Sequence, residues 1–124
     1  MKVNNYQELA MRTNDNKSTD RLAERIGQTS GYNFDMVGAL LNGALGLTGE
    51  AGEVADIIKK YAFHGHNIRV PELIKELGDV CWYVALLSSA LGVDLEVILK
   101  ENVKKLKDRY PEGFSSEASI NRRI

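Results

Sequence analysis

Residues 37–53 read VGALLNGALGLTGEAGE, and residues 76–87 read ELGDVCWYVALL. Both stretches are apolar at most positions, which is typical of helices that are buried on nearly every side. Each stretch also carries an acidic pair with three-residue spacing, Glu50 with Glu53 and Glu76 with Asp79. This spacing places the two carboxylates of a pair on one helix face, with Cβ atoms roughly 5–6 Å apart. The two segments therefore predict two apolar helices that each carry a pair of acids.

The acidic pairs predict a cation site. Carboxylates are almost never fully buried unless they are paired or bound to a metal, because desolvating an isolated charge is too costly. If the two helices pack antiparallel, the pairs face each other, and four nearby carboxylates raise one another's pKa unless a counter-charge is present. An all-oxygen ligand set suits Mg²⁺ or Mn²⁺ and not Zn²⁺. Because Mg²⁺ often completes its shell with substrate phosphates, we expect a phosphorylated substrate.

Length and composition predict one soluble globular domain. The chain has 124 residues, of which 44% are hydrophobic and 27% charged, as in ordinary single domains. The net charge of −1 gives no indication of nucleic-acid binding. The first residues lack a signal-peptide core and polar residues interrupt the apolar stretches, so we expect a cytoplasmic protein without a membrane span. The single cysteine, Cys81, stands in an apolar run and is expected to be a small core residue.

Helix start and stop signals predict five helices and almost no strand. Capping residues, a proline in the first turn, and glycine or proline after the last turn mark the helix ends. We expect helices at about 5–12, from Ser18 or Thr19 to Ile26, from a cap at Asn33 or Asp35 to Phe63, from Pro71 to Leu91, and from Leu95 to Tyr110. Residues 14–33 are interpreted as an insertion that includes a loop at 29–32, and residues 112–124 as an extended tail.

Glycines recur every third residue in the long apolar helix, at Gly46, Gly49 and Gly52. A glycine inside a helix costs about 1 kcal/mol relative to alanine. Three of them predict that another backbone or a ligand closely approaches this helix.

A polar stripe on the last expected helix complements the acids. Asn102, Lys105 and Arg109 lie at positions i, i+3 and i+7, on one face of the helix. Such a stripe can bind a polyphosphate that is already bridged to a metal ion, although taken alone it is more typical of a solvated face. Lys59 and Lys60, which follow the first acidic pair, are candidates for the same role.

Two aromatic residues follow the second acidic pair. Trp82 and Tyr83 are expected in the core or at a subunit interface, and stacking on a nucleotide base is the alternative. His64 and His66 are interpreted as loop residues at a helix end.

Three segments carry a family resemblance. They are residues 45–56 (LGLTGEAGEVAD), 75–83 (KELGDVCWY) and 102–114 (NxxKLxxRYPEGF). Together they closely resemble the MazG-like nucleotide pyrophosphohydrolases of the all-α NTP pyrophosphatase superfamily, which includes the dimeric dUTPases and phosphoribosyl-ATP pyrophosphohydrolases. Residues 6–12 fit the usual start of these proteins, whereas residues 14–33 fit less well.

The resemblance implies an all-α, four-helix-bundle-like fold, assembled as a dimer or a dimer of dimers, with a pocket near a subunit interface. It also implies Mg²⁺-dependent hydrolysis of nucleoside triphosphates to the monophosphate and pyrophosphate. The implied metal ligands are Glu50, Glu53, Glu76 and Asp79, and Glu53 or Glu50 also positions or deprotonates the attacking water. The implied substrate-binding residues are Asn102, Lys105 and Arg109, with Lys60 and Tyr83 as further candidates.

Other classes of protein are alternatives. A di-iron carboxylate bundle requires Glu-x-x-His pairs, and neither acidic pair here ends in histidine. A non-catalytic helical module that binds a nucleotide or a protein would be expected to have lost its metal ligands, and all four acids are present. Within the superfamily, a dUTP or phosphoribosyl-ATP specialist is a further alternative.

Overall fold

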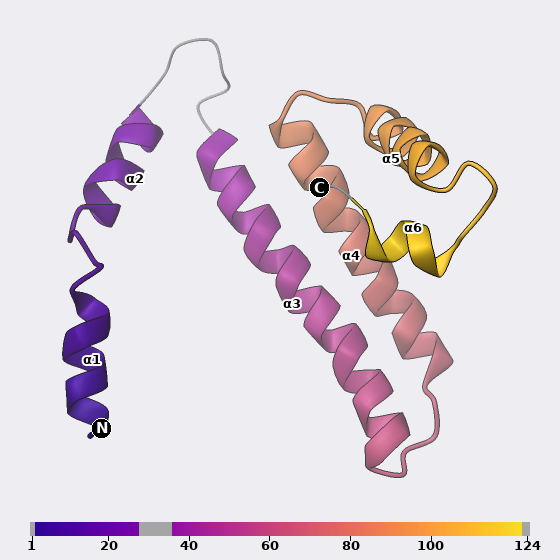
Figure 1. Cartoon of the computed structure of the whole chain (residues 1–124), viewed down its shortest axis with the longest axis horizontal. Coiled ribbons are helices and arrows are strands. Elements are labelled where there is room, and N and C mark those ends of the chain that lie inside the picture. The colour runs from indigo at the N-terminus through magenta and orange to yellow at the C-terminus, as the bar shows by residue number, and fades with distance from the viewer. Residues whose placement is uncertain (1, 28–35, 123–124) are drawn as a thin grey trace. The chain divides into compact units, whose positions relative to one another are not determined.

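The computed structural model describes residues 2–27 and 36–122, which form six helices and no strand (Figure 1). The prediction of an all-α fold is therefore confirmed for this part of the chain. The molecule divides into two compact units, residues 1–38 and 39–124, and each is described by itself.

The first unit contains two short helices. Helix α1 spans Val3–Met11 and helix α2 spans Ser18–Gly27, close to the predicted bounds. In the turn between them, the side chain of Asp15 accepts a hydrogen bond from the Lys17 amide at 3.0 Å and pairs with Arg21. The predicted cap at Asn33 or Asp35 and the predicted loop at 29–32 lie outside the described residues.

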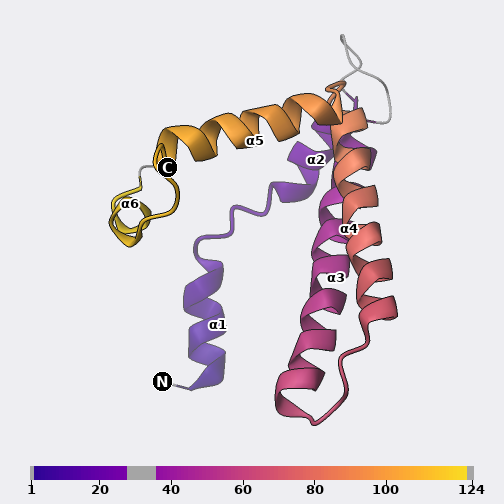
Figure 2. The same ribbon diagram turned by 90° about the vertical axis from the view of Figure 1, so that its right-hand side faces the viewer.

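The second unit is built on an antiparallel helical hairpin. Helix α3 (Met36–Phe63) and helix α4 (Val70–Ala90) lie side by side in both views (Figures 1 and 2). Gly65 adopts a φ of 72° in the connection, a backbone conformation that glycine adopts without strain. Pro71 lies in the first turn of α4, as predicted.

Glycines allow the two helices to pack closely. A Cβ atom added to Gly43 would lie 2.6 Å from the Leu87 side chain, and one added to Gly46 would collide with the Tyr83 ring. Gly46 is thus closely approached, but by the Tyr83 side chain and not by the backbone or ligand that was predicted. A Cβ on Gly49 or Gly52 would meet no described atom within 4 Å.

Helix α5 (Leu95–Arg109) leaves α4 at a bend of 104° (Figure 2). Gly92, with a φ of 66°, lies in the turn, and the Ser88 hydroxyl donates a hydrogen bond to the Val93 carbonyl. Among the described helices, none is long and apolar enough by itself to cross a membrane, and only the bent pair of α4 and α5 meets the length and composition criteria together.

The prediction of an extended tail was wrong. Residues 116–120 form a short helix, α6 (Ser116–Ile120). The Ser115 hydroxyl accepts a hydrogen bond from the Ala118 amide at 3.1 Å, which satisfies one of the amides that a helix start leaves unpaired. A helix of five residues is too short to show a hydrophobic period, so the sequence pattern did not reveal it.

The described part of one chain encloses almost no core. Of its large hydrophobic side chains, Ile57 alone is buried, whereas Leu45, Phe63 and Trp82 are 74%, 82% and 58% exposed. Cys81 is also exposed, so its predicted place in a core is wrong for a single chain. An apolar surface of this extent is typical of a chain that packs against another protein.

Candidate functional site

Three acidic side chains converge where α3 and α4 pack together. One carboxylate oxygen from each lies within 4.8 Å of the others. The three residues are Glu50 from α3 and Glu76 and Asp79 from α4. We call them the acidic cluster. Glu50 and Glu76 are half-buried and Asp79 is exposed, so the cluster lies at the edge of the helix interface.

The electrostatics of the acidic cluster favour a bound cation. Partial burial raises the pKa of Glu50 above its usual value, and the hydrogen bond with Glu76 and the negative charge of Asp79 raise this pKa further. Neighbouring carboxylates repel one another when all of them are ionised. A divalent cation would neutralise several of them together.

The donor set fits Mg²⁺ or Mn²⁺. All three groups are carboxylates, the hard oxygen ligands that these ions prefer. Oxygens bound to one Mg²⁺ lie no more than about 4.2 Å apart, because each bond is about 2.1 Å long. The observed limit of 4.8 Å is close enough that small side-chain rotations would let the three oxygens bind one ion, with water or substrate oxygens as its remaining ligands.

A shallow cavity adjoins the acids. It has a volume of about 320 Å³ and is lined by Glu50, Asp79, Trp82 and Tyr83. The two aromatic rings meet edge to face, with centroids 4.9 Å apart and planes at 86°. Tyr83 is half-buried with its ring against Gly46, whereas Trp82 is largely exposed. The cavity therefore places an aromatic surface directly beside the carboxylates.

The fourth predicted ligand lies outside the acidic cluster. Glu53 is exposed on α3, one turn beyond Glu50, and its charge is the smallest of the contributions that raise the pKa of Glu50. It is therefore close enough to influence the cluster without sharing its geometry. Its roles as a metal ligand and as the group that activates water stay predictions.

Lys60 already forms an ion pair with Asp56 on its own helix. Its ammonium group lies 2.5 Å from a carboxylate oxygen of Asp56, and Lys59 lies 3.9 Å from the other oxygen. The hydrogen bond from Lys60 lowers the pKa of Asp56. A phosphate would have to compete with Asp56 for Lys60, and its predicted substrate contact stays a prediction.

The predicted cations of α5 lie away from the acids of the same chain. Asp79 precedes the end of α4 by about three turns, roughly 16 Å along the helix axis, and α5 then turns away by 104°. Lys105 and Arg109 line a different pocket of about 620 Å³. Asn102 is exposed on α5 and is not among the residues that line this pocket. One chain thus does not bring the two halves of the predicted site together.

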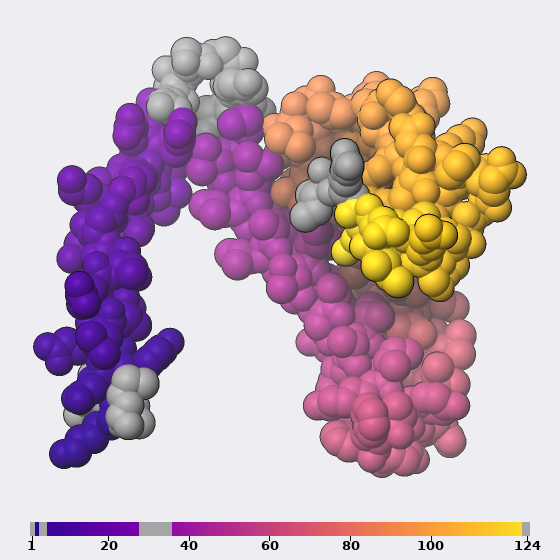
Figure 3. Space-filling model, viewed as in Figure 1, coloured from indigo at the N-terminus to yellow at the C-terminus, as the bar shows by residue number. Residues whose placement is uncertain are grey.

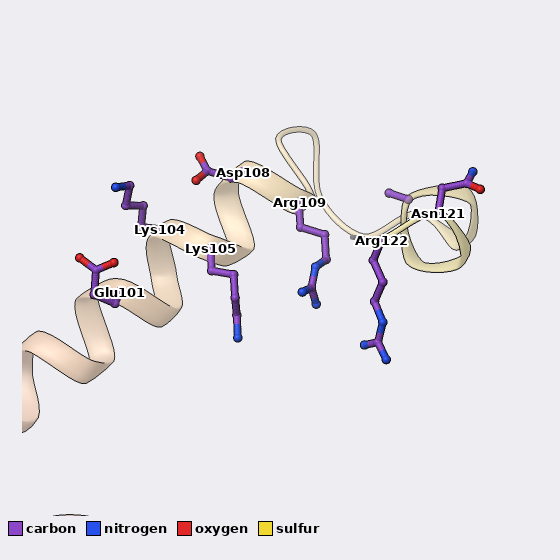
Figure 4. A pocket seen from close by; sticks show the side chains of 8 residues that line it. Glu101, Lys104, Lys105, Asp108, Arg109, Asn121 and Arg122 are labelled. Atoms are coloured by element: carbon purple, nitrogen blue, oxygen red, sulfur yellow. The ribbon is translucent and has the colours of Figure 1, made fainter. Parts of the chain in front are cut away.

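The pocket on α5 contains residues that the sequence analysis missed. Its lining includes Lys104 from α5 and Asn121 and Arg122 from the segment that follows α6 (Figure 4). The only signal in the sequence was a pair of adjacent arginines near the end of the tail, at 122 and 123, and the expectation of an extended tail gave no reason to place either near α5.

Comparison with known protein families identifies one family for this chain. The model of the MazG nucleotide pyrophosphohydrolase domain matches residues 41–114, which include all four acids and the α5 stripe. Gene 37 protein of Mycobacterium phage L5 is 37% identical over 92 residues, which cover 71% of this chain and 81% of that protein. Uncharacterized protein YvdC of Bacillus subtilis (strain 168) is 31% identical over 96 residues, which cover 70% and 84%. No solved structure matches the chain significantly.

Proposed function

Because the chain belongs to the MazG nucleotide pyrophosphohydrolase family, we propose that it is a Mg²⁺-dependent nucleoside triphosphate pyrophosphohydrolase. It converts a ribo- or deoxyribonucleoside triphosphate and water into the monophosphate and pyrophosphate, and serves nucleotide-pool sanitation or balance. The observation that supports this proposal most directly is the acidic cluster, in which carboxylates from two helices meet beside an aromatic cavity.

The acidic cluster and Glu53 have different roles in the proposed reaction. The acidic cluster holds Mg²⁺, or Mn²⁺, which when bound neutralises the phosphate oxygens and polarises the bonds to phosphorus. Glu53, the exposed neighbour of the cluster, accepts a proton from the water that attacks phosphorus. The bond between the α-phosphate and the bridging oxygen, or between that oxygen and the β-phosphate, breaks as the new bond forms. Hydrolysis in ¹⁸O-labelled water identifies which phosphorus is attacked, since the label enters the monophosphate or the pyrophosphate.

The aromatic side chains of the cavity provide a place for the base. Tyr83 and Trp82 line the same cavity as Glu50 and Asp79. Stacking a base on an aromatic ring contributes about 1–3 kcal/mol and tolerates different bases. A base at Tyr83 would lie beside the acids that receive the phosphates through the metal.

The active form is a dimer or a dimer of dimers. A single chain leaves its large apolar side chains exposed and holds the α5 cations away from the acids. Both observations are explained if a second copy covers the apolar hairpin and supplies its own α5 to the acidic cluster. The site would then be complete only in the assembly.

The experiment is a pyrophosphate-release assay with purified protein, Mg²⁺ and a panel of nucleoside triphosphates. At least one triphosphate should be cleaved, and EDTA should stop the reaction. Glu50→Gln should lower kcat/KM by at least about 100-fold, because even second-shell partners of a metal contribute 10–100-fold. The matched control is Glu96→Gln, since Glu96 is exposed and, among the described residues, its ion pair is with Lys100 one turn along the same helix. Tight nucleotide binding without pyrophosphate release would instead identify a non-catalytic nucleotide-binding module.

A further inference from the structure

The segment after α6 returns to α5 because a series of local contacts bends the chain. Gly113 adopts a φ of 89° and its amide donates to the Tyr110 carbonyl at 3.1 Å. The rings of Tyr110 and Phe114 pack with centroids 5.5 Å apart, and Ser115 caps α6. Figure 3 shows α6 (yellow) and α5 (orange) as one continuous surface. The return places Arg122 beside the C-terminal half of α5.

The pocket between α5 and α6 has an uneven distribution of charge. It has a volume of about 620 Å³. In Figure 4, the side chains of Lys105, Arg109 and Arg122 extend to the same side, whereas the carboxylates of Glu101 and Asp108 extend to the other. None of the three cations forms an ion pair within the described part of the chain. We call these three residues the cationic trio.

The cationic trio favours an anionic ligand with more than one charged group. Three neighbouring positive charges repel one another, and a bound anion removes this repulsion. Guanidinium groups bind phosphate oxygens through two parallel hydrogen bonds, and lysine binds them as a point charge. Lys105 and Arg109 are one turn apart, roughly 6 Å along the helix axis. A diphosphate spans this separation better than a single phosphate does.

We propose that Arg122 is the third cation of a diphosphate-binding pocket that the α6 segment closes against α5. The ligand class is a polyphosphate, and Arg122 contacts it directly together with Lys105 and Arg109. The identification of this polyphosphate as the β- and γ-phosphates of a nucleotide, and later as the pyrophosphate product, rests on the proposed function. The proposal that the pocket binds a polyphosphate does not rest on the proposed function, because the shape and charge of the pocket are independent of any reaction.

The test is calorimetric titration of the full chain with inorganic pyrophosphate in the presence of EDTA, so that no metal at the acidic cluster contributes. Wild-type protein should bind pyrophosphate more tightly than inorganic phosphate. Arg122→Gln should weaken pyrophosphate binding about tenfold, the effect of losing one charge-assisted contact. Arg122→Lys should give an intermediate affinity because it retains the charge and loses the paired hydrogen bonds. Circular dichroism should show the same helix content in all variants.

The matched control is Lys104→Gln. Lys104 also lines the pocket, but its side chain extends away from the cationic trio (Figure 4). This variant removes the same charge, so it corrects for the loss of long-range attraction, and it should change pyrophosphate affinity less than about twofold. The proposal is overturned if wild-type protein does not bind pyrophosphate, or if Arg122→Gln binds it as tightly as Lys104→Gln does.

Two further measurements separate this proposal from the proposed function. Glu50→Gln should bind pyrophosphate in EDTA with wild-type affinity although it has lost turnover. If no nucleotide is cleaved but Arg122→Gln still loses pyrophosphate affinity, the pocket stands and the enzymatic proposal fails. If nucleotides are cleaved and Arg122→Gln leaves both KM and pyrophosphate affinity unchanged, the enzymatic proposal stands and the role of Arg122 fails.

Discussion

The environment of Glu50 disfavours the ionised form of its carboxyl group. Glu50 is half-buried, it shares a hydrogen bond with Glu76, and Asp79 adds a further negative charge nearby. Each of these raises its pKa, so in the metal-free protein the ionised carboxylate destabilises the fold. A divalent cation reverses that effect. Ionised Glu50 therefore destabilises the metal-free protein, and the same carboxylate favours binding of a divalent cation.

This raised pKa predicts an unusual pH dependence of stability. The folded-state pKa of Glu50 lies above its unfolded value, so its stabilising contribution is present below the unfolded pKa and is lost as pH rises through the folded pKa. In EDTA, the melting temperature of Glu50→Gln relative to wild type should therefore increase between about pH 4.5 and pH 7, because the amide does not titrate. Thermal melts at several pH values measure this difference. Mg²⁺ should raise the wild-type melting temperature at pH 7 more than that of the variant. If the melting temperatures of the two proteins depend on pH and on Mg²⁺ in the same way, Glu50 is neither a group of raised pKa nor a metal ligand.

Glu53 should behave differently from Glu50 under substitution. It lies outside the acidic cluster but within reach of its charges, which suits a group that accepts a proton from water. We predict that Glu53→Gln lowers kcat by about 10²–10⁴-fold, the usual contribution of a general base, whereas Glu50→Gln also weakens Mg²⁺ binding. Steady-state kinetics across a Mg²⁺ series separate the two effects. A Glu53→Gln enzyme with wild-type kcat would remove Glu53 from the chemistry.

At the scale of elements, the sequence predicted most helices because their ends carry distinct chemical signals. Pro71 and Gly92 bracket α4, and Asp94 immediately precedes α5, although its side chain makes no capping hydrogen bond. Helix α6 was missed because five residues hold no hydrophobic period. The glycine pattern coincides with a tight contact at Gly46, made by the Tyr83 side chain and not by a backbone or ligand, and with none at Gly49. Spacing alone cannot distinguish them, since which glycine faces a neighbour depends on the rotation of α3 against α4.

The difference between these glycines predicts opposite effects on stability. Gly46→Ala places a methyl group against the Tyr83 ring, so the helices must separate or the ring must move, at a cost of about 1–3 kcal/mol. Gly49→Ala meets no described atom within 4 Å and improves helix propensity by up to about 1 kcal/mol. Chemical denaturation of the two variants measures both changes. Equal stability of the two variants would show that the α3–α4 contact at Tyr83 is not formed as described.

At the scale of the whole molecule, the acids and the cations were both predictable from the sequence, but their separation within one chain was not. The acidic pairs were predictable because they lie in otherwise apolar helices, and the α5 stripe was predictable from the spacing of its polar residues. The bend of 104° that separates them depends on a short turn at Gly92 and on the packing of α4 against α5. The exposed apolar side chains on the hairpin are the surface on which the proposed second copy would pack, but the residues of one chain do not determine the geometry of that contact.

The proposed shared site predicts complementation between inactive variants. Glu50→Gln removes a metal ligand, and the double variant Lys105→Ala, Arg109→Ala removes the cations. In a mixed dimer, one site receives both defects and the other receives neither, provided that acids and cations come from different copies. The mixed dimer, co-expressed with two tags and purified by both, should recover about half of the wild-type activity per dimer, while each variant alone stays inactive. Light scattering confirms the dimer. If acids and cations acted within one chain, every site in the mixed dimer would be defective and no activity would return.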